Sequence, residues 1–283
     1  MQDRIPSRTA WRVAARRAAH QLFDSPRVFE DPLALRILGS QGALAVERDV
    51  IEREHTRAAR ALRAFMAVRS RFAEDQLALA IGRGVGQFVI LGAGLDTFAY
   101  RNPFADCLRV FEVDHPATQA WKRDLLEQAN IAIPSSVTFV ALDFERDAFQ
   151  EALSAGGFTA REPAFFSWLG VTMYLTRETA LAVLRFIASL PAGSGVAFDY
   201  AVSPALLGPI ERWAVTAFSR RLAAMGEPWT LFFDPSELLT DLHALGFSHV
   251  ADLGPKEINS RFFSGRTDGL EVGSLGRLME ARR

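Results

Sequence analysis

The sequence predicts a single α/β domain built on a mostly parallel sheet with helices on both faces. Three observations lead to this prediction. Short apolar runs alternate with helix-like segments between residues 87 and 200, which is typical of βαβ units. The run Phe88–Leu91 is apolar throughout, as expected of a strand buried on both faces. The 283 residues contain no Pro/Gly-rich linker, and α/β folds reach ~250 residues as one domain.

Residues 1–84 are expected to form a helical cap. Arg8–Phe23 is rich in Ala and Arg, and a short apolar stretch, 33–38, precedes Gly39. A long helix is predicted over Ile51–Ile81, because its large apolar residues recur near helical spacing. Glycines at 82, 84 and 86 are expected to end that helix.

The sheet core is expected to comprise residues 85–200 and 233–283. Its predicted strands are 88–91, 108–113, 137–142, 163–169 and 196–200, with helices at 116–129, 148–153 and 177–190 between them. After residue 233 we expect a helix over 235–245, because Asp234-Pro235 is typical of an N-cap followed by proline at the first helical position. Further strands are predicted at 247–253 and 278–281.

Residues 201–232 are expected to form a helical lid insertion, with a helix over 204–225. This segment is rich in large apolar side chains, so we expect it to contact an apolar acceptor molecule. The residues concerned are Leu206, Leu207, Trp213, Phe218, Trp229 and Phe232, with Phe233 directly after them.

Composition excludes several classes of protein. The formal net charge is −1, whereas a nucleic-acid binder usually carries a basic surplus. Cys107 is the only cysteine, which rules out an intramolecular disulfide, and no histidine pair has the spacing of a metal site. With no 18-residue apolar run and no secretory signal, we expect a cytoplasmic protein that contacts no membrane. The Arg-rich N-terminus is better interpreted as part of the fold than as a mitochondrial presequence.

The strongest functional motif is the loop Gly92-Ala93-Gly94, directly after the first strand. Such glycines allow the backbone to approach a ligand closely. Asp114 ends the next strand, 20 residues after Gly94, where a carboxylate can accept hydrogen bonds from both hydroxyls of a ribose. A dinucleotide site would need a third glycine, but Thr97 stands there, and Asp96 would repel a diphosphate. The pattern favours S-adenosylmethionine over NAD.

Asp143 and Phe144 follow the third predicted strand. An Asp side chain with the next backbone N–H can recognise the edge of an adenine, and Phe144 can cover the ring. The alternative interpretation is that Asp143 is the N-cap of the helix after it.

The sequence resembles the bacterial branch of the leucine carboxyl methyltransferase family, S-adenosylmethionine-dependent enzymes of the class I (Rossmann-like) methyltransferase fold. The glycine loop with Asp96-Thr97 and the stretch Gly170-Val171-Thr172-Met173-Tyr174-Leu175 are its most specific parts. Supporting matches are Ser7–Ala10, Arg17–His20, Phe29–Pro32, Arg69–Phe72, Tyr100-Arg101, Glu112–Asp114, Asp143-Phe144 and Arg266–Leu270.

The resemblance implies roles for matching residues. Arg69 is expected to bind the methionine carboxylate of the donor, with Arg71 as the second choice. Gly92 and Gly94 would support the methionine part, Asp114 would bind the ribose, and Asp143 and Phe144 would bind the adenine. Asp96 is expected to belong to the donor site and also to pair with Arg101. Where many relatives carry a glutamate near the donor's amino group, this chain has Leu169, so the amine is expected to find other partners, such as strand-end carbonyls or Asp96.

The reaction expected is methyl transfer to a carboxylate or hydroxyl oxygen of a small apolar acceptor. A carboxylate needs no base, whereas a hydroxyl usually does. Candidate catalytic residues are His20, Tyr174 and Tyr200, with Asp199 nearby on the fifth strand. The alternatives are carboxyl methylation of a protein C-terminus, an NAD-type oxidoreductase, and a donor-binding protein without activity. The founding enzymes' substrate, the C-terminal leucine of a phosphatase, is not assumed for this chain.

Overall fold

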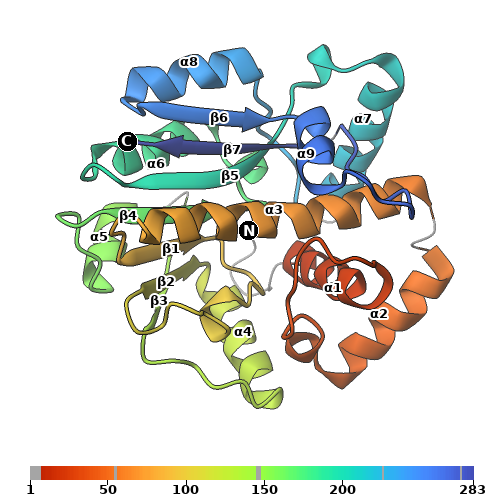
Figure 1. Ribbon diagram of the computed structural model, residues 1–283, viewed down its shortest axis with the longest axis horizontal. Helices are drawn as coiled ribbons and strands as arrows, with labels where there is room; N and C mark the ends of the chain where they lie inside the picture. Colours follow the sequence, from red (N-terminus) through yellow and green to blue (C-terminus); the bar gives the residue numbers. More distant parts are fainter. Residues whose placement is uncertain (1–7, 54–55, 145–147, 225, 275) are drawn as a thin grey trace.

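The computed structural model describes residues 8–53, 56–144, 148–224, 226–274 and 276–283, so Ser7 of the matched N-terminal motif lies outside the described residues. They contain a seven-stranded sheet with the strand order β3-β2-β1-β4-β5-β7-β6 (Figure 1). The first five strands are parallel, and β7 runs antiparallel to both of its neighbours. The strands are β1 Gln87–Leu91, β2 Arg109–Asp114, β3 Val137–Ala141, β4 Ala164–Trp168, β5 Gly195–Ala201, β6 His249–Leu253 and β7 Gly276–Arg282.

Helices cover both faces of the sheet, as the sequence predicts. Along β1, Val89 and Leu91 point to a core shared with α5 (Phe149–Ala155), α6 (Arg177–Ser189) and α8 (Pro235–Leu245). Phe88 and Ile90 point to the opposite core, shared with α3 (Arg57–Ile81) and α9 (Pro255–Phe262). This alternation, together with α4 (Pro116–Gln128) between β2 and β3, confirms the predicted α/β sheet.

The N-terminal region is helical, but the helices differ from those predicted. It comprises α1 (Arg8–Phe23), the short helix η1 (Arg36–Leu38), α2 (Gly39–Arg53) and α3. The predicted helix over 51–81 is wrong in its first part, because Thr56 starts α3 by accepting a hydrogen bond from the amide of Ala59 at 3.2 Å. Gly39 ends η1 and begins α2, a helix that the sequence pattern missed.

The segment after β5 also differs in detail. A short helix η4 (Pro204–Leu206) precedes α7 (Pro209–Ala223), and Pro209 occupies the first turn of α7. The predicted single helix over 204–225 is therefore wrong at its start. Asp234 caps α8 as expected, by accepting from the amides of Ser236 and Glu237. Helix α9 was not predicted, although Pro255 and Glu257 are typical first-turn residues.

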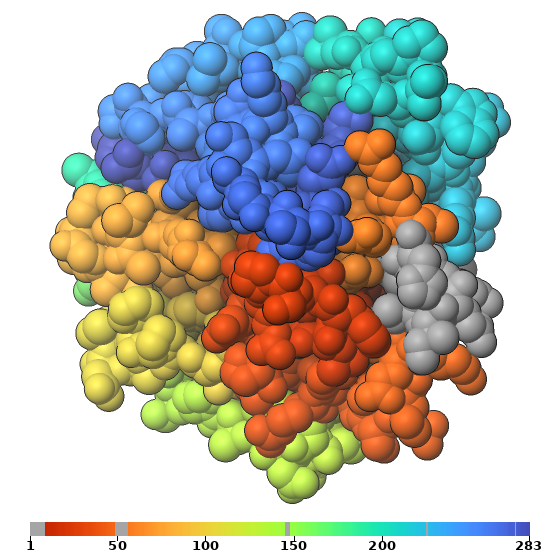
Figure 2. Space-filling model, turned by 45° about the vertical axis from the view of Figure 1, so that its right-hand side comes forward, coloured from red at the N-terminus to blue at the C-terminus, as the bar shows by residue number. Residues whose placement is uncertain are grey.

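The N-terminal helices and α7 gather at one end of the sheet. Figure 1 shows α1, α2 and α7 on the side to which the parallel strands point. In Figure 2, α1 (red) lies across this end with C-terminal residues (blue) directly above it. Arg266 donates to the carbonyl of Pro26, in the segment that follows α1. None of the described helices has both the length and the apolar character needed to cross a bilayer.

Candidate active site

A cavity of about 1280 Å³ lies at the carboxyl ends of the parallel strands. Ligands of open α/β sheets bind at this edge. The cavity is bordered by the ends of β1, β2, β4 and β5, by α1 and α3, and by α7 with the residues after it. The lining includes the predicted Arg69, Gly92, Gly94, Asp96, Asp114, Asp143, Phe144, Tyr174 and Tyr200.

The glycine loop is fixed at the floor of this cavity. Gly92 and Gly94 have φ angles of 66° and 44°, which favour glycine. A Cβ atom on Gly92 would lie 2.2 Å from Cγ2 of Val171, so no larger residue fits without displacing that side chain. The amide of Gly92 donates to the carbonyl of Val113 at 2.8 Å, which ties the loop to β2.

Asp114 ends β2 beside this loop. Its Oδ2 accepts from the amide of Gly94 at 2.5 Å, and its Oδ1 accepts from the amide of His115 at 2.6 Å. Burial raises the pKa of the Asp114 carboxyl, although both amides oppose the shift. The carboxylate is thus positioned by backbone groups while it lines the cavity. This agrees with the spacing inferred from the sequence.

Asp96 also lines the cavity, but its partner is not the predicted one. Its Oδ1 accepts from the amide of Phe98 at 2.8 Å, and its Oδ2 lies 3.9 Å from Nη1 of Arg17 on α1. Arg17 also donates to the carbonyl of Leu95 at 2.7 Å. Burial opposes ionisation of Asp96, but nearby Arg17, Lys122 and Arg101 prevail and lower its pKa.

The predicted pairing of Arg101 with Asp96 is therefore corrected. Arg101 donates from Nη1 to Glu74 of α3 at 2.9 Å, and its Nε lies 3.5 Å from Asp31. Arg101 directly follows η2 (Phe98–Tyr100), Glu74 belongs to α3, and Asp31 lies in the segment after α1. Arg101 consequently ties the end of the glycine loop to α3. It makes no hydrogen bond to Asp96 among the described residues, but its charge helps to lower the pKa of the Asp96 carboxyl.

Asp143 and Phe144 line the cavity after β3. The interpretation of Asp143 as a helix cap is excluded, because α5 begins at Phe149 and its N-cap is Ala148. The Phe144 ring lies 6.1 Å from the Phe149 ring, which holds it against the sheet core. Both residues therefore stand where a ligand of the cavity can contact them.

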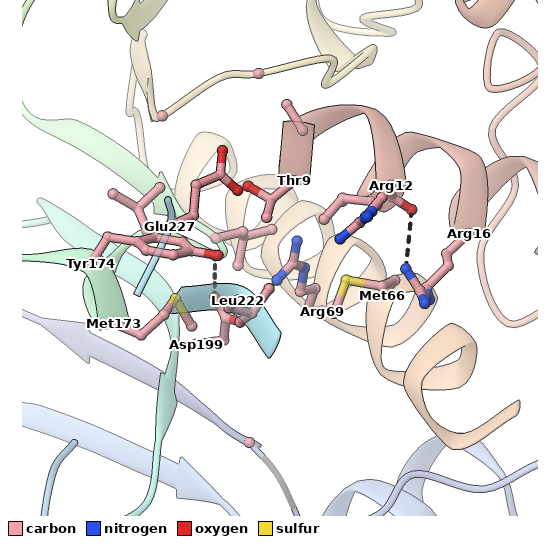
Figure 3. A pocket seen from close by; sticks show the side chains of 18 of the residues that line it. Thr9, Arg12, Arg16, Met66, Arg69, Met173, Tyr174, Asp199, Leu222 and Glu227 are labelled. Atoms are coloured by element: carbon pink, nitrogen blue, oxygen red, sulfur yellow. Dashed lines mark hydrogen bonds and ion pairs between the residues drawn. The ribbon is translucent and has the colours of Figure 1, made fainter. Parts of the chain in front are cut away.

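Arg69 occupies the middle of the cavity, as Figure 3 shows. It projects from α3, it is 5% exposed, and its Nη1 donates to Oδ2 of Asp199 on β5 at 3.0 Å. A Cβ atom on Gly170 would lie 2.9 Å from both Nη1 and Nη2, so the absence of a side chain there makes room for the guanidinium. Arg71, the second choice, pairs with Asp75 at 2.7 Å on the outer surface of α3 and does not reach the lining.

The three predicted catalytic residues have different surroundings. His20 is fully buried outside the cavity lining: Nδ1 bonds Asp24 at 2.8 Å, and Nε2 accepts from the amide of Val28 at 3.1 Å. The expectation that His20 acts in catalysis is wrong on this geometry, because both ring nitrogens hold the structure together. Tyr200 lines the cavity, but its hydroxyl donates to Asp252 at 3.1 Å.

Of the three predicted catalytic residues, Tyr174 is the one whose side chain both lines the cavity and could bind a ligand there. Its side chain is partly exposed and lies beside Glu227 and Thr9 in Figure 3. Burial raises the pKa of the Tyr174 hydroxyl, so it is protonated at neutral pH and can donate a hydrogen bond. Burial likewise raises the pKa of the Tyr200 hydroxyl.

Several residues of the outer cavity carry no signal in the sequence. Side chains from α1, α3 and α7 meet there, and Figure 3 shows Arg12, Arg16, Met66 and Leu222 around the same space as Arg69. The amide of Thr230 donates to the carbonyl of Met173 at 2.8 Å, which holds the residues after α7 against the β4 side of the cavity. Only tertiary packing brings these segments together.

Solved structures share this arrangement of the whole chain. A Thermobifida fusca protein, provisionally named as a methyltransferase, superposes with a TM-score of 0.56 at 17% identity over 91% of this chain and 96% of its own. A DUF574 family protein of Streptomyces avermitilis gives a TM-score of 0.54 at 16% identity, with 95% and 97% covered. The fold, with a glycine loop and a strand-end carboxylate at one cavity, is that of the class I methyltransferases.

The family follows from sequence comparison. The model of the leucine carboxyl methyltransferase family matches residues 10–188. The Bacillus subtilis protein YktD, provisionally named as an S-adenosyl-L-methionine-dependent methyltransferase, is 33% identical over 96% of both chains. SCO7813 of Streptomyces coelicolor, which carries the same provisional name, is 30% identical over 79% of both chains. This chain belongs to the leucine carboxyl methyltransferase family and is an S-adenosylmethionine-dependent methyltransferase.

The cavity lining fits S-adenosylmethionine. Asp114 offers a carboxylate to ribose hydroxyls, and Asp143 with Phe144 offers a polar edge and a ring to an adenine. A buried guanidinium, Arg69, offers hydrogen bonds to a carboxylate. Gly92 and Gly94 line the cavity between these two groups of residues, where the methionine part would lie.

Proposed function

We propose that this enzyme transfers the methyl group to a carboxylate or hydroxyl oxygen of a small, apolar acceptor. The observation that carries the proposal is a group of apolar side chains in the outer part of the cavity, where the charged Arg12 and Arg16 also lie. Residues from α3, from η3 (Thr172–Tyr174) and from the segment 201–232 form its walls there, and they are Leu62, Phe65, Met66, Met173, Phe218, Leu222 and Trp229.

The aromatic pair Phe218 and Trp229 supports the role of 201–232 as a lid over the acceptor. Their ring centroids lie 5.2 Å apart with an interplanar angle of 74°, an edge-to-face contact. One ring belongs to α7 and the other to the chain that returns to η3, so the contact closes the segment on itself beside the cavity. An acceptor with an apolar body would replace water against these rings.

In the proposed donor site, Arg69 binds the methionine carboxylate and Asp114 binds the ribose hydroxyls. Asp143 and Phe144 bind the adenine, while Gly92 and Gly94 support the methionine part. Asp96 helps to hold the loop. When bound, S-adenosylmethionine supplies an electrophilic methyl group, and the protein's task is to align the acceptor oxygen with it.

The three predicted catalytic residues do not offer a general base. His20 and Tyr200 are engaged elsewhere, and Tyr174 is protonated. We therefore propose that Tyr174 orients the acceptor by donating a hydrogen bond. A carboxylate acceptor, already ionised at neutral pH, needs no more than this.

Incubation of the enzyme with S-adenosylmethionine and a panel of apolar carboxylic acids and phenols tests the proposal. Formation of S-adenosylhomocysteine and of a methyl ester or ether is the expected result. Trp229→Ala should raise the KM for an accepted compound about tenfold through lost apolar contact, without changing donor affinity. Leu239→Ala, at an exposed position of α8, is the matched control. Methylation confined to protein C-termini would refute the small acceptor.

A further inference from the structure

The charges of Arg69 and Asp199 form a buried pair inside the cavity. Their side chains are 6% and 2% exposed, and Nη1 of Arg69 lies 3.0 Å from Oδ2 of Asp199. The other oxygen of Asp199, Oδ1, accepts from the amide of Gly170 at 2.5 Å. The carbonyl of Asp199 accepts from the hydroxyl of Thr172 at 2.9 Å. Gly170 and Thr172 thus hold Asp199 in place beside Arg69.

Neither member of the pair has used all its hydrogen-bonding capacity. Among the described residues, Nε and Nη2 of Arg69 have no acceptor, and neither atom is fully enclosed by protein. Each carboxylate oxygen of Asp199 accepts one hydrogen bond, from Arg69 or from Gly170, and can accept another. Because both residues line the cavity, a ligand bound there could use these remaining donors and acceptors.

The sheet places Asp199 beside Leu169, the residue that stands where many relatives carry a glutamate. Trp168 of β4 pairs with Phe198 of β5, so Asp199 stands next to Leu169 in register, one strand away. Residues at one level of parallel neighbours point to the same face of the sheet. Leu169 packs against the core shared with α3, and Asp199 meets Arg69 of α3 on that same side.

A fixed pair of opposite charges is complementary to a group that carries both charges on one carbon. The amino-acid end of S-adenosylmethionine is such a group, with a carboxylate and an ammonium on the same atom. A guanidinium favours the carboxylate, and an adjacent carboxylate favours the ammonium. Since the pair is already formed, binding leaves neither protein charge uncompensated.

We propose that Asp199 binds the ammonium group of the donor while Arg69 binds its carboxylate. This inference rests on the donor site proposed above. Asp199 would then select for an intact amino-acid end, through a contact that Leu169 cannot make.

Calorimetry with three compounds tests Asp199 separately from the reaction. The compounds are S-adenosylhomocysteine, its analogue without the amino group, and its analogue without the carboxylate. The wild-type protein should prefer S-adenosylhomocysteine over the desamino analogue about tenfold or more, as expected of a charged hydrogen bond. In Asp199→Asn this preference should fall to about threefold or less. The preference over the decarboxylated analogue should persist.

The opposite pattern would overturn the proposal. If Asp199 only orients Arg69, Asp199→Asn keeps the preference over the desamino analogue and loses the preference over the decarboxylated one. Glu280→Gln is the matched control, because Glu280 is also buried beside an arginine, Arg282, but outside the cavity. It should leave both preferences unchanged.

A folding defect does not prevent the test. If Asp199→Asn fails to fold, the double variant Arg69→Gln/Asp199→Asn removes both charges together and avoids an unpaired buried guanidinium. Loss of the preference over the desamino analogue in that variant supports the proposal, and its persistence refutes it. A wild-type protein that binds S-adenosylhomocysteine but methylates no compound of the acceptor panel would contradict the proposed reaction, not the role of Asp199.

Discussion

At the scale of the residue, Gly92 shows how one position links sequence, packing and site. The motif indicates a turn after a buried strand, but it does not say which atoms exclude a side chain. The structure identifies Val171, from the stretch that resembles the family's Gly-Val-Thr motif, as the residue against Gly92. The two most specific motifs of the sequence are therefore in contact, and a larger residue in place of Gly92 would overlap Val171.

The first prediction concerns this contact. Gly92→Ala should destabilise the fold by about 2–3 kcal/mol, because it combines a positive φ with an overlap that Val171 must relieve. It should also weaken binding of S-adenosylhomocysteine, and thermal unfolding and calorimetry measure the two effects. Gly269→Ala is the matched control: its φ is 67°, against 66° for Gly92, but open space surrounds it. Equal losses in the two variants would show that backbone strain alone matters.

The proposed donor residues Arg69, Asp114, Asp143 and Phe144 can be inferred from the sequence because they belong to local motifs. The partner of Arg69 cannot, since Asp199 is 130 residues away in the chain. His20 illustrates the reverse case. It belongs to a matched motif, yet its two ring nitrogens are hydrogen-bonded to Asp24 and to the amides of Val28 and Phe29.

At the scale of the element, a buried network joins α1 to α3. Asp24, just after α1, receives 2.9 Å hydrogen bonds from Nε and Nη2 of Arg63 on α3, and it bonds His20 of α1. Burial opposes ionisation of Asp24, but these partners prevail and lower its pKa from 3.8 to about 2. The network fixes the helix that covers the cavity.

The second prediction is an acid dependence of this network. Because the folded-state pKa of Asp24 is below its unfolded value, its stabilising contribution is complete above about pH 4 and is lost as the pH falls towards 2. Asp24→Ala should cost about 3 kcal/mol at pH 7, since it leaves Arg63 buried without its partner. Urea unfolding between pH 2 and 7 should show this cost shrinking below pH 4. A cost that is independent of pH would contradict the ionic origin.

At the scale of the whole molecule, the cavity is enclosed by segments from both ends of the chain. α1, α3, the sheet edge and the residues around α7 each supply part of its wall, although they span residues 9 to 276. A ligand bound there would contact segments that lie far apart in the chain. Binding should therefore stabilise the molecule as a unit.

The third prediction follows from this enclosure. S-adenosylhomocysteine at about 100 times its Kd should raise the free energy of unfolding by about 2.7 kcal/mol, and hydrogen exchange should slow in α1 and α7 as well as in the glycine loop. NAD at the same concentration should change neither, because Asp96 beside the glycine loop would repel its diphosphate. Protection limited to the glycine loop would show that α1 and α7 do not close on the donor.

The sequence by itself determined the α/β sheet, the order of its parallel strands along the chain, the family and most of the proposed donor residues. These predictions follow from apolar periodicity and strand-end motifs, which are patterns within about 25 consecutive residues. Only the tertiary structure decided which carboxylate meets Arg69, that both ring nitrogens of His20 are hydrogen-bonded, and which side chains line the outer cavity. Those outcomes depend on contacts between segments far apart in the chain, and such contacts exist only once the helices have packed onto the sheet.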